Sequence, residues 1–216
     1  MVLFYETSEK YVIYMGRDKY ENEELIKFGL PTDYWFHVDD MSSAHVYLRM
    51  KDVEETIDTV SAVTINECAA LVKANSIEGC KKHEVTVIYT PWANLNKTSD
   101  MTDGAIGFHD RKKVTRVKIG KNNPIVNALN RSKREETPDL YQIQADFAAA
   151  EVARGKERKK EFIKTQEAEK QAREEEAKLH SYASLHDNSN AGTVSNADFW
   201  GGDDDTTAAA FEDDFM

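Results

Sequence analysis

Cysteines, prolines and long apolar runs are scarce in this sequence. The 216 residues include two cysteines and four prolines, and Cys68 and Cys80 have the spacing of neither a metal site nor a redox motif. No run of 18 apolar residues occurs, which predicts that no helix spans a membrane. The N-terminal residues lack the basic region and apolar core of a signal peptide. These absences argue against a disulfide scaffold and predict a protein of the cytoplasm or the nucleus.

Basic residues are missing from the last part of the chain. The sequence has 28 Lys and Arg against 39 Asp and Glu, a net charge of −11. Residues 182–216 hold eight of the acids and no Lys or Arg, whereas residues 111–134, here called the basic window, hold nine Lys and Arg and no acid. The basic window has the sign of a phosphate-binding surface. The net acidity of the whole chain therefore does not exclude a nucleic-acid ligand.

Composition divides the chain into three parts. Residues 1–138 carry the periodic apolar segments and predict a single α+β domain with an antiparallel sheet and packed helices. Residues 139–181 contain no proline and one glycine, and their strong helix formers predict a long charged helix. Its apolar residues do not sustain a heptad, which favours a solvated helix over a coiled coil. Residues 182–216 predict a disordered acidic tail, and aromatic islands in it suit docking to a protein partner.

Short β-branched runs and capped apolar stripes predict the elements of the first part. The predicted strands are Val2–Tyr5, Tyr11–Met15, Tyr34–Val38, His45–Met50, Glu84–Thr90 and Val114–Ile119. The predicted helices are Asn22–Phe28, with Asn22 as its cap, and Ile57–Asn75. The first two strands form one predicted hairpin, and the next two form another around a turn at residues 39–43.

The second predicted hairpin carries the densest group of aromatic and polar side chains. With a period of two, Trp35 and His37 share a face, as do His45, Tyr47 and Arg49. One interpretation is recognition of nucleic acid, in which aromatic rings stack on bases while His and Arg bond to phosphate or sugar. Another is ordinary packing of a sheet. Both interpretations remain open at the level of sequence.

A third interpretation of the same hairpin is catalytic. His37, His45, Asp39 and Asp40 are residue types that bind metals, and together they suggest a metal-dependent hydrolase. However, the sequence places no third ligand on another element and contains no nucleophile motif. We therefore expect no catalytic residues, no metal and no cofactor, and keep the hydrolase as an alternative.

A second cluster follows the predicted strand at 84–90. Asn94 and Lys97 come directly after it, and Gly104 and Gly107 precede an aromatic residue and a histidine. This composition suits a loop that approaches a charged ligand. The basic window then supplies the cations expected to meet phosphates, which are Arg111, Lys112, Lys113, Arg116, Lys118 and Lys121.

Several of these motifs resemble, in order, the signature of the NFACT-R domain. They are Trp35-Phe36-His37-Val38, Ser42-Ser43-Ala44-His45-Val46, Tyr89-Thr90, Asn94-Leu95 and Gly104-Ala105-Ile106-Gly107. NFACT-R domains are regarded as RNA-binding modules of ribosome-associated quality-control factors, and the family has no established catalytic residues. The resemblance implies a protein that binds RNA, free or in a ribonucleoprotein particle such as the ribosome, with DNA as the alternative ligand.

Two departures from the family pattern limit what the resemblance implies. The large factors have an N-terminal domain and a helical middle region without a counterpart here, so their role on the ribosome is not carried over. Many relatives have two lysines where this chain has Asn96-Lys97, so one cation of that loop is missing. The remaining alternative is a protein-interaction adaptor that acts through the charged helix and the acidic tail.

Overall fold

The computed structural model describes residues 1–98, 100–102 and 104–180. It contains two compact units, Met1–Gly155 and the part of the chain that begins at Lys156. The acidic tail at 182–216 lies outside the described residues, so its disorder and its protein-docking role stay predictions. The division at residues 138 and 181 also stays a prediction.

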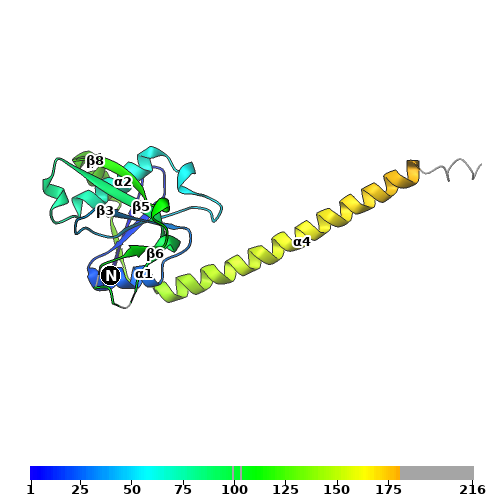
Figure 1. Cartoon of the computed structure of the whole chain (residues 1–216), viewed down its shortest axis with the longest axis horizontal. Helices are drawn as coiled ribbons and strands as arrows, with labels where there is room; N and C mark the ends of the chain where they lie inside the picture. Colours follow the sequence, from blue (N-terminus) through cyan, green and yellow to red (C-terminus); the bar gives the residue numbers. More distant parts are fainter. Residues whose placement is uncertain (99, 103, 181–216) are drawn as a thin grey trace, which may run out of the picture. The chain divides into compact units, whose positions relative to one another are not determined.

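A seven-stranded sheet lies at the centre of the first unit (Figure 1). Its strands are β1 (Val2–Glu6), β2 (Val12–Gly16), β3 (Asp33–Val38), β4 (Val46–Arg49), β5 (Glu84–Pro91), β8 (Thr115–Gly120) and β9 (Arg134–Glu136). The order is β8-β5-β3-β4-β2-β1-β9, and every neighbouring pair is antiparallel. The six predicted strands and the antiparallel α+β fold are confirmed, whereas β9 was not predicted.

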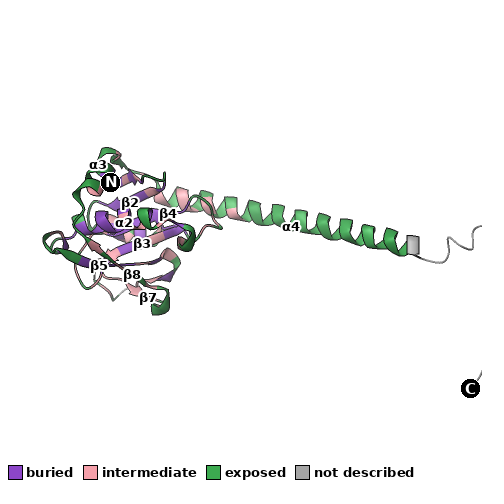
Figure 2. Cartoon of the chain, turned by 90° about the horizontal axis from the view of Figure 1, so that it is seen from above, coloured by how far each residue is buried: buried purple, intermediate pink, exposed green. Residues whose placement is uncertain are grey.

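Helices and a small hairpin cover both faces of the sheet. On one face, α2 (Ala62–Ala74) and α3 (Asn123–Arg131) pack with the inward side chains of the strands in the main core. On the other face, α1 (Lys19–Lys27) and the pair formed by β6 (Leu95–Asn96) and β7 (Gly107–Phe108) enclose a second apolar cluster. Figure 2 shows buried residues running through the strands between these layers. Side chains on either face of the central strands are therefore removed from water.

Helix α1 begins earlier than the sequence predicted. Asp18, not Asn22, is its N-cap: the Asp18 carboxylate accepts hydrogen bonds from the backbone N–H of Tyr20 and Glu21 at 2.9 and 3.0 Å. Asn22 lies inside the helix and is buried. The predicted helix 57–75 is divided into a short 3-10 turn, η1 (Ile57–Thr59), and α2, because the Ser61 hydroxyl caps the second helical segment.

The long charged helix is present as α4 (Leu140–His180). Most of its residues between 145 and 178 are exposed, as Figure 2 shows. The predicted long helix is confirmed, and the choice between a solvated helix and a coiled coil stays a prediction. Among the residues that the structure describes, no helix has the length and apolar character needed to cross a membrane.

Candidate nucleic-acid interface

Strand β8 and the turn before it form a basic edge of the sheet. In β8, Val117 and Ile119 pack against the main core, so the alternating Arg116 and Lys118 point to the other face and are exposed. The preceding 3-10 turn, η4 (Arg111–Lys113), is capped by Asp110, whose carboxylate accepts from the backbone N–H of Lys112 at 2.8 Å. We call the exposed cations of this region the β8 edge: Arg111, Lys112, Lys113, Arg116, Lys118 and Lys121.

The basic window does not form one surface. Lys133 and Arg134 belong to the segment of β9, at the opposite edge of the sheet from β8. There Lys133 pairs with Glu135 at 2.9 Å and Arg134 with Glu136 at 4.0 Å. On the β8 edge, by contrast, the ion pair found within the described residues joins Arg116 to Asp39 at 3.0 Å. The chain thus separates an edge dominated by cations from one whose cations are neutralised by neighbouring acids.

Asn94 stabilises the turn at the start of the β8 edge through its side-chain hydrogen bonds. It is buried, and its amide nitrogen donates to the Thr90 hydroxyl at 2.9 Å and to the Asp110 carbonyl at 2.8 Å. Its amide oxygen accepts from the Asp110 backbone N–H at 2.8 Å. The Thr90 hydroxyl in turn donates to the carbonyl of Lys113 at 3.0 Å. Asn94 therefore holds η4 in place, and both ends of its amide are engaged within the protein.

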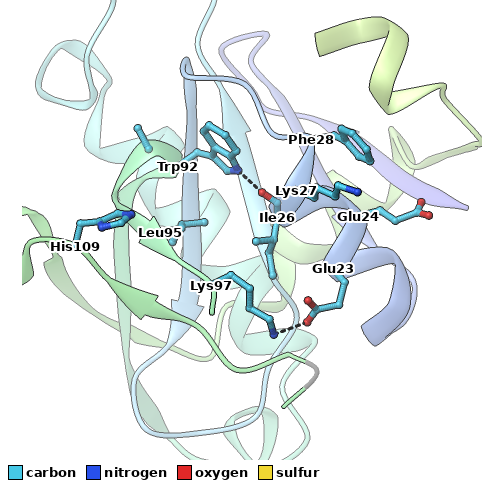
Figure 3. Close-up of a pocket in the computed structure, with 10 residues that line it drawn as sticks. Glu23, Glu24, Ile26, Lys27, Phe28, Trp92, Leu95, Lys97 and His109 are labelled. Carbon is cyan, nitrogen blue, oxygen red and sulfur yellow. Dashed lines mark hydrogen bonds and ion pairs between the residues drawn. The ribbon is translucent and has the colours of Figure 1, made fainter. Parts of the chain in front are cut away.

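Lys97 is likewise engaged within the protein. Its ammonium group pairs with Glu23 of α1 at 2.8 Å (Figure 3). It also donates to the carbonyls of Thr102 and Ala105 at 2.9 and 3.0 Å. These bonds tie the segment between β6 and β7 to α1. Lys97 thus fixes this segment rather than presenting a free cation.

The aromatic residues of the central hairpin lie in the core. Trp35 and Tyr47 are 1 % and 0 % exposed, and the ring of Tyr47 stacks on Tyr14 at 5.0 Å between centroids. Trp35 packs against His37 on one side and Phe108 of β7 on another, with centroid distances of 5.2 and 5.7 Å. Neither Trp35 nor Tyr47 offers a ring face to a base, because the layer of α1, β6 and β7 covers this face of the sheet.

Arg49 belongs to a buried ionic network around Asp33. The fully buried Asp33 carboxylate accepts from the Arg49 guanidinium at 2.9 and 3.0 Å, from the Tyr14 hydroxyl at 2.5 Å and from the Leu30 backbone N–H at 3.0 Å. Arg49 also lies over the Tyr14 ring at 5.0 Å. Sequence reasoning missed this network, because Asp33 precedes the predicted strand and nothing in its neighbours indicates burial.

His37 of β3 and His45, just before β4, lie side by side. Their ring centroids are 5.1 Å apart in an edge-to-face arrangement. Burial lowers the pKa of both imidazoles, and for His45 burial and the neighbouring His37 lower the pKa to about 3. His45 is therefore neutral at physiological pH. No group of three or more His, Cys, Asp or Glu side chains able to hold a metal occurs among the described residues.

The two histidines line a cavity of about 570 Å³ beside the start of α1. Asn22 lies in the same wall, and the buried Oδ1 of Asn22 and Nδ1 of His45 have no hydrogen-bond partner within the part of the chain that the structure describes. The rim includes Arg17, which is exposed and was not singled out from the sequence. This cavity can accept a polar group of a ligand.

The low pKa of His45 predicts a loss of stability in acid. The folded protein keeps His45 neutral down to about pH 3, whereas the unfolded chain takes up the proton near pH 6.5. The free energy of unfolding should thus fall by about 1.4 kcal/mol per pH unit from this site as the pH drops below about 6. Urea unfolding at a series of pH values should show that His45→Gln flattens the profile. The exposed His83→Gln is the matched control, and equal profiles for the two variants would contradict the assignment.

Comparisons with known proteins identify the family. The family model described as NFACT protein RNA binding domain matches residues 1–110. Coiled-coil domain-containing protein 25 of Bos taurus is 46 % identical over 196 residues, 85 % of this chain and 91 % of the bovine protein. The protein of that name from Mus musculus is 54 % identical over 145 residues, 64 % of this chain and 69 % of the mouse protein.

A solved structure shows the same fold in a more distant protein. The C-terminal part of the fibronectin/fibrinogen-binding protein from Streptococcus suis has a TM-score of 0.50 and 17 % sequence identity, over 61 % of this chain and 48 % of that structure. The family-model match ends at residue 110, just before the β8 edge begins. The match over half of the sequence and the similarity to the bovine protein along nearly its full length show that this chain belongs to the NFACT RNA-binding domain family.

Proposed function

We propose that this chain is a non-enzymatic protein that binds nucleic acid, with RNA as its ligand, through the β8 edge. The single observation that carries the proposal is the group of six exposed cations on and around η4 and β8, accompanied within the described residues by one acidic partner, Asp39. Such an edge matches the phosphate backbone in charge. Membership of an RNA-binding domain family supports RNA as the ligand.

The contacts divide into two kinds under this proposal. The cations of the β8 edge meet phosphates, which contribute affinity that depends on salt. His37 and the cavity it lines take up polar groups of the ligand. Trp35 and Tyr47 stabilise the hairpin by packing in the core. Asn94 and Lys97 act indirectly, since they hold the loop and η4 in position.

The exposed apolar residues of the second unit support one other function. Phe162 and Ile163 of α4 are 65 % and 46 % exposed and are neighbours on a charged helix. An exposed apolar pair suits a protein partner. The protein-interaction adaptor is therefore the second candidate function, and it is compatible with a nucleic-acid ligand on the first unit.

The proposal predicts a difference between the two halves of the basic window. Neutralising Lys112 and Lys113 together should weaken binding to a labelled stem–loop RNA. The slope of log affinity against log salt should fall by about 0.7–0.9 for each phosphate that the variant no longer neutralises. The pair Lys133→Ala/Arg134→Ala removes the same charge from the opposite edge of the sheet and should leave the slope unchanged. The measurement is a fluorescence titration at several salt concentrations.

Two further results bear on the proposal. Circular dichroism must first show that both double variants are folded. If the Lys112→Ala/Lys113→Ala variant then keeps the affinity and salt slope of the unmodified protein, the β8 edge is a solvated surface and the proposal fails. A DNA stem–loop of matching sequence, titrated in parallel, distinguishes DNA from RNA as the preferred ligand.

A further inference from the structure

A cavity of about 590 Å³ opens beside the β8 edge, between the turn after β3 and the segment that joins β7 to β8. Its apolar wall includes Ile88, Phe108 and Val114, and its rim includes Arg111 and Arg116. The cavity lies on the face of the sheet covered by β6 and β7, since Ile88, Phe108 and Val114 belong to the second apolar cluster. It falls within the volume range of small-molecule sites, about 300–1,000 Å³.

The register of the strands explains why an apolar wall and a cation meet here. Ile88 of β5 pairs directly with Arg116 of β8, so their side chains project from the same face of the sheet. Ile88 is buried, whereas Arg116 is exposed and lies at the rim of the cavity. A single strand pair thereby supplies both a nonpolar surface and a positive charge at its edge.

Gly107 keeps the side of the cavity near β7 open. A Cβ atom at this position would lie 3.2 Å from the terminal methyl of Met101 and 3.3 Å from the carbonyl oxygen of Asn96. Both of these residues also line the cavity. A larger side chain at 107 would therefore push into the wall, and glycine leaves the space free.

Two acids, Asp39 and Asp40, also line the cavity, and Asp39 positions Arg116. Asp39 accepts from Nε of Arg116 at 3.0 Å, which leaves the terminal nitrogens of the guanidinium for another acceptor. Arg111 lies on the same rim and is exposed. The cavity thus combines an aromatic ring, aliphatic walls, two arginines and the two acids. The ring and the guanidinium nitrogens that Asp39 leaves unbonded suit a planar base attached to a phosphate chain.

We infer that this cavity takes one unstacked base of a single-stranded RNA segment, with its ring against Phe108 and its flanking phosphates at Arg111 and Arg116. The inference rests on the proposed function and deepens it: the β8 edge holds the backbone, and the cavity selects RNA whose bases are free to leave the stack. A fully paired duplex cannot fill the cavity, because its bases face one another inside the helix.

The test uses a short single-stranded RNA of mixed sequence and a set of copies, each with one abasic nucleotide. At one or two positions the abasic copy should bind about 5- to 150-fold more weakly to the full chain, the range expected when one base no longer stacks. Phe108→Ala should weaken binding of the intact RNA to a similar extent and abolish the difference between the intact and abasic RNA. The salt slope should stay unchanged, since no cation is removed.

Two more variants make the test robust. Because Phe108 packs near Trp35, its replacement could disturb folding, so Val114→Phe serves as a second variant that fills the cavity while keeping an apolar residue. Phe28→Ala is the matched control, since Phe28 lines a different cavity beside α1 (Figure 3). It should leave RNA binding and the abasic effect unaltered.

The outcomes separate this inference from the proposed function. If RNA binds through Lys112 and Lys113, but abasic substitution, Phe108→Ala and Val114→Phe are all without effect, the cavity does not hold a base and the proposed function stands. Equal affinity for a paired duplex and for the single strand also overturns the inference. If the full chain binds none of these RNAs, the proposed function itself fails.

Discussion

Replacing Asp33 by asparagine is expected to lower the free energy of unfolding by about 3–5 kcal/mol. The Asp33 carboxylate is fully buried and holds the Arg49 guanidinium, the Tyr14 hydroxyl and the Leu30 backbone N–H. Removing its charge leaves the partly buried Arg49 without a counter-ion, and this desolvated cation causes most of the destabilisation. Urea unfolding monitored by circular dichroism measures the change.

A matched substitution tests whether burial is the cause. Asp39 also pairs with an arginine, but Arg116 in that pair is 62 % exposed. Asp39→Asn should therefore change the free energy of unfolding by no more than about 1 kcal/mol. Similar destabilisation by Asp33→Asn and Asp39→Asn would show that the buried Asp33 network stabilises the fold no more than an exposed ion pair does.

Trp35→Ala is expected to cost about 3–5 kcal/mol of unfolding free energy, the range for deleting a buried aromatic side chain. Trp35 is enclosed by His37, His45 and Phe108, at centroid distances of 5.2–5.7 Å. The indole N–H has no hydrogen-bond partner among the residues that the structure describes, so the larger part of the cost comes from packing rather than from a broken bond. Thermal and urea unfolding both report it.

Trp35→Phe separates a core role from direct stacking on RNA. Phenylalanine keeps an aromatic ring in the core and should retain both the fold and RNA affinity. If Trp35→Phe is as stable as the unmodified protein yet loses RNA affinity, then the indole contacts the ligand and the hairpin opens during binding. If both variants lose stability in proportion to the volume removed and bind RNA normally once folded, Trp35 is a core residue.

The sequence predicted local structure well because each strand carries its own pattern. The β-branched and basic residues at 114–119 marked the strand β8, which the structure confirms. The sequence did not predict that Arg116 and Lys118 share the face turned away from the main core, where Val117 and Ile119 pack. β9 consists of three charged and exposed residues, Arg134, Glu135 and Glu136, so no apolar pattern marks it in the sequence. Its place depends on pairing with β1, a contact between distant parts of the chain that no local pattern encodes.

The candidate site was predicted less completely, for two physical reasons. A period of two distinguishes the faces of a strand, but it does not tell whether a second layer covers the outer face. Here β6 and β7 cover it, so Trp35 and Tyr47 are buried rather than exposed. Cations that are close in the sequence also need not lie on one surface. Lys113 and Lys133 belong to the same acid-free window, yet they lie at opposite edges of the sheet.

The pairing of β9 with β1 has a consequence for synthesis of the protein. Val2 lies opposite Glu136, and the Ser132 hydroxyl bonds to the backbone of Glu6. The outer edge of β1 thus stays unpaired until about 130 further residues have been made, roughly 7–26 s at 5–20 residues per second. During that interval the N-terminal strand presents open hydrogen-bonding groups that can pair with another nascent chain. β9 is therefore the last strand to join the sheet. Translation that stalls before residue 134 leaves the outer edge of β1 unpaired and prone to aggregation.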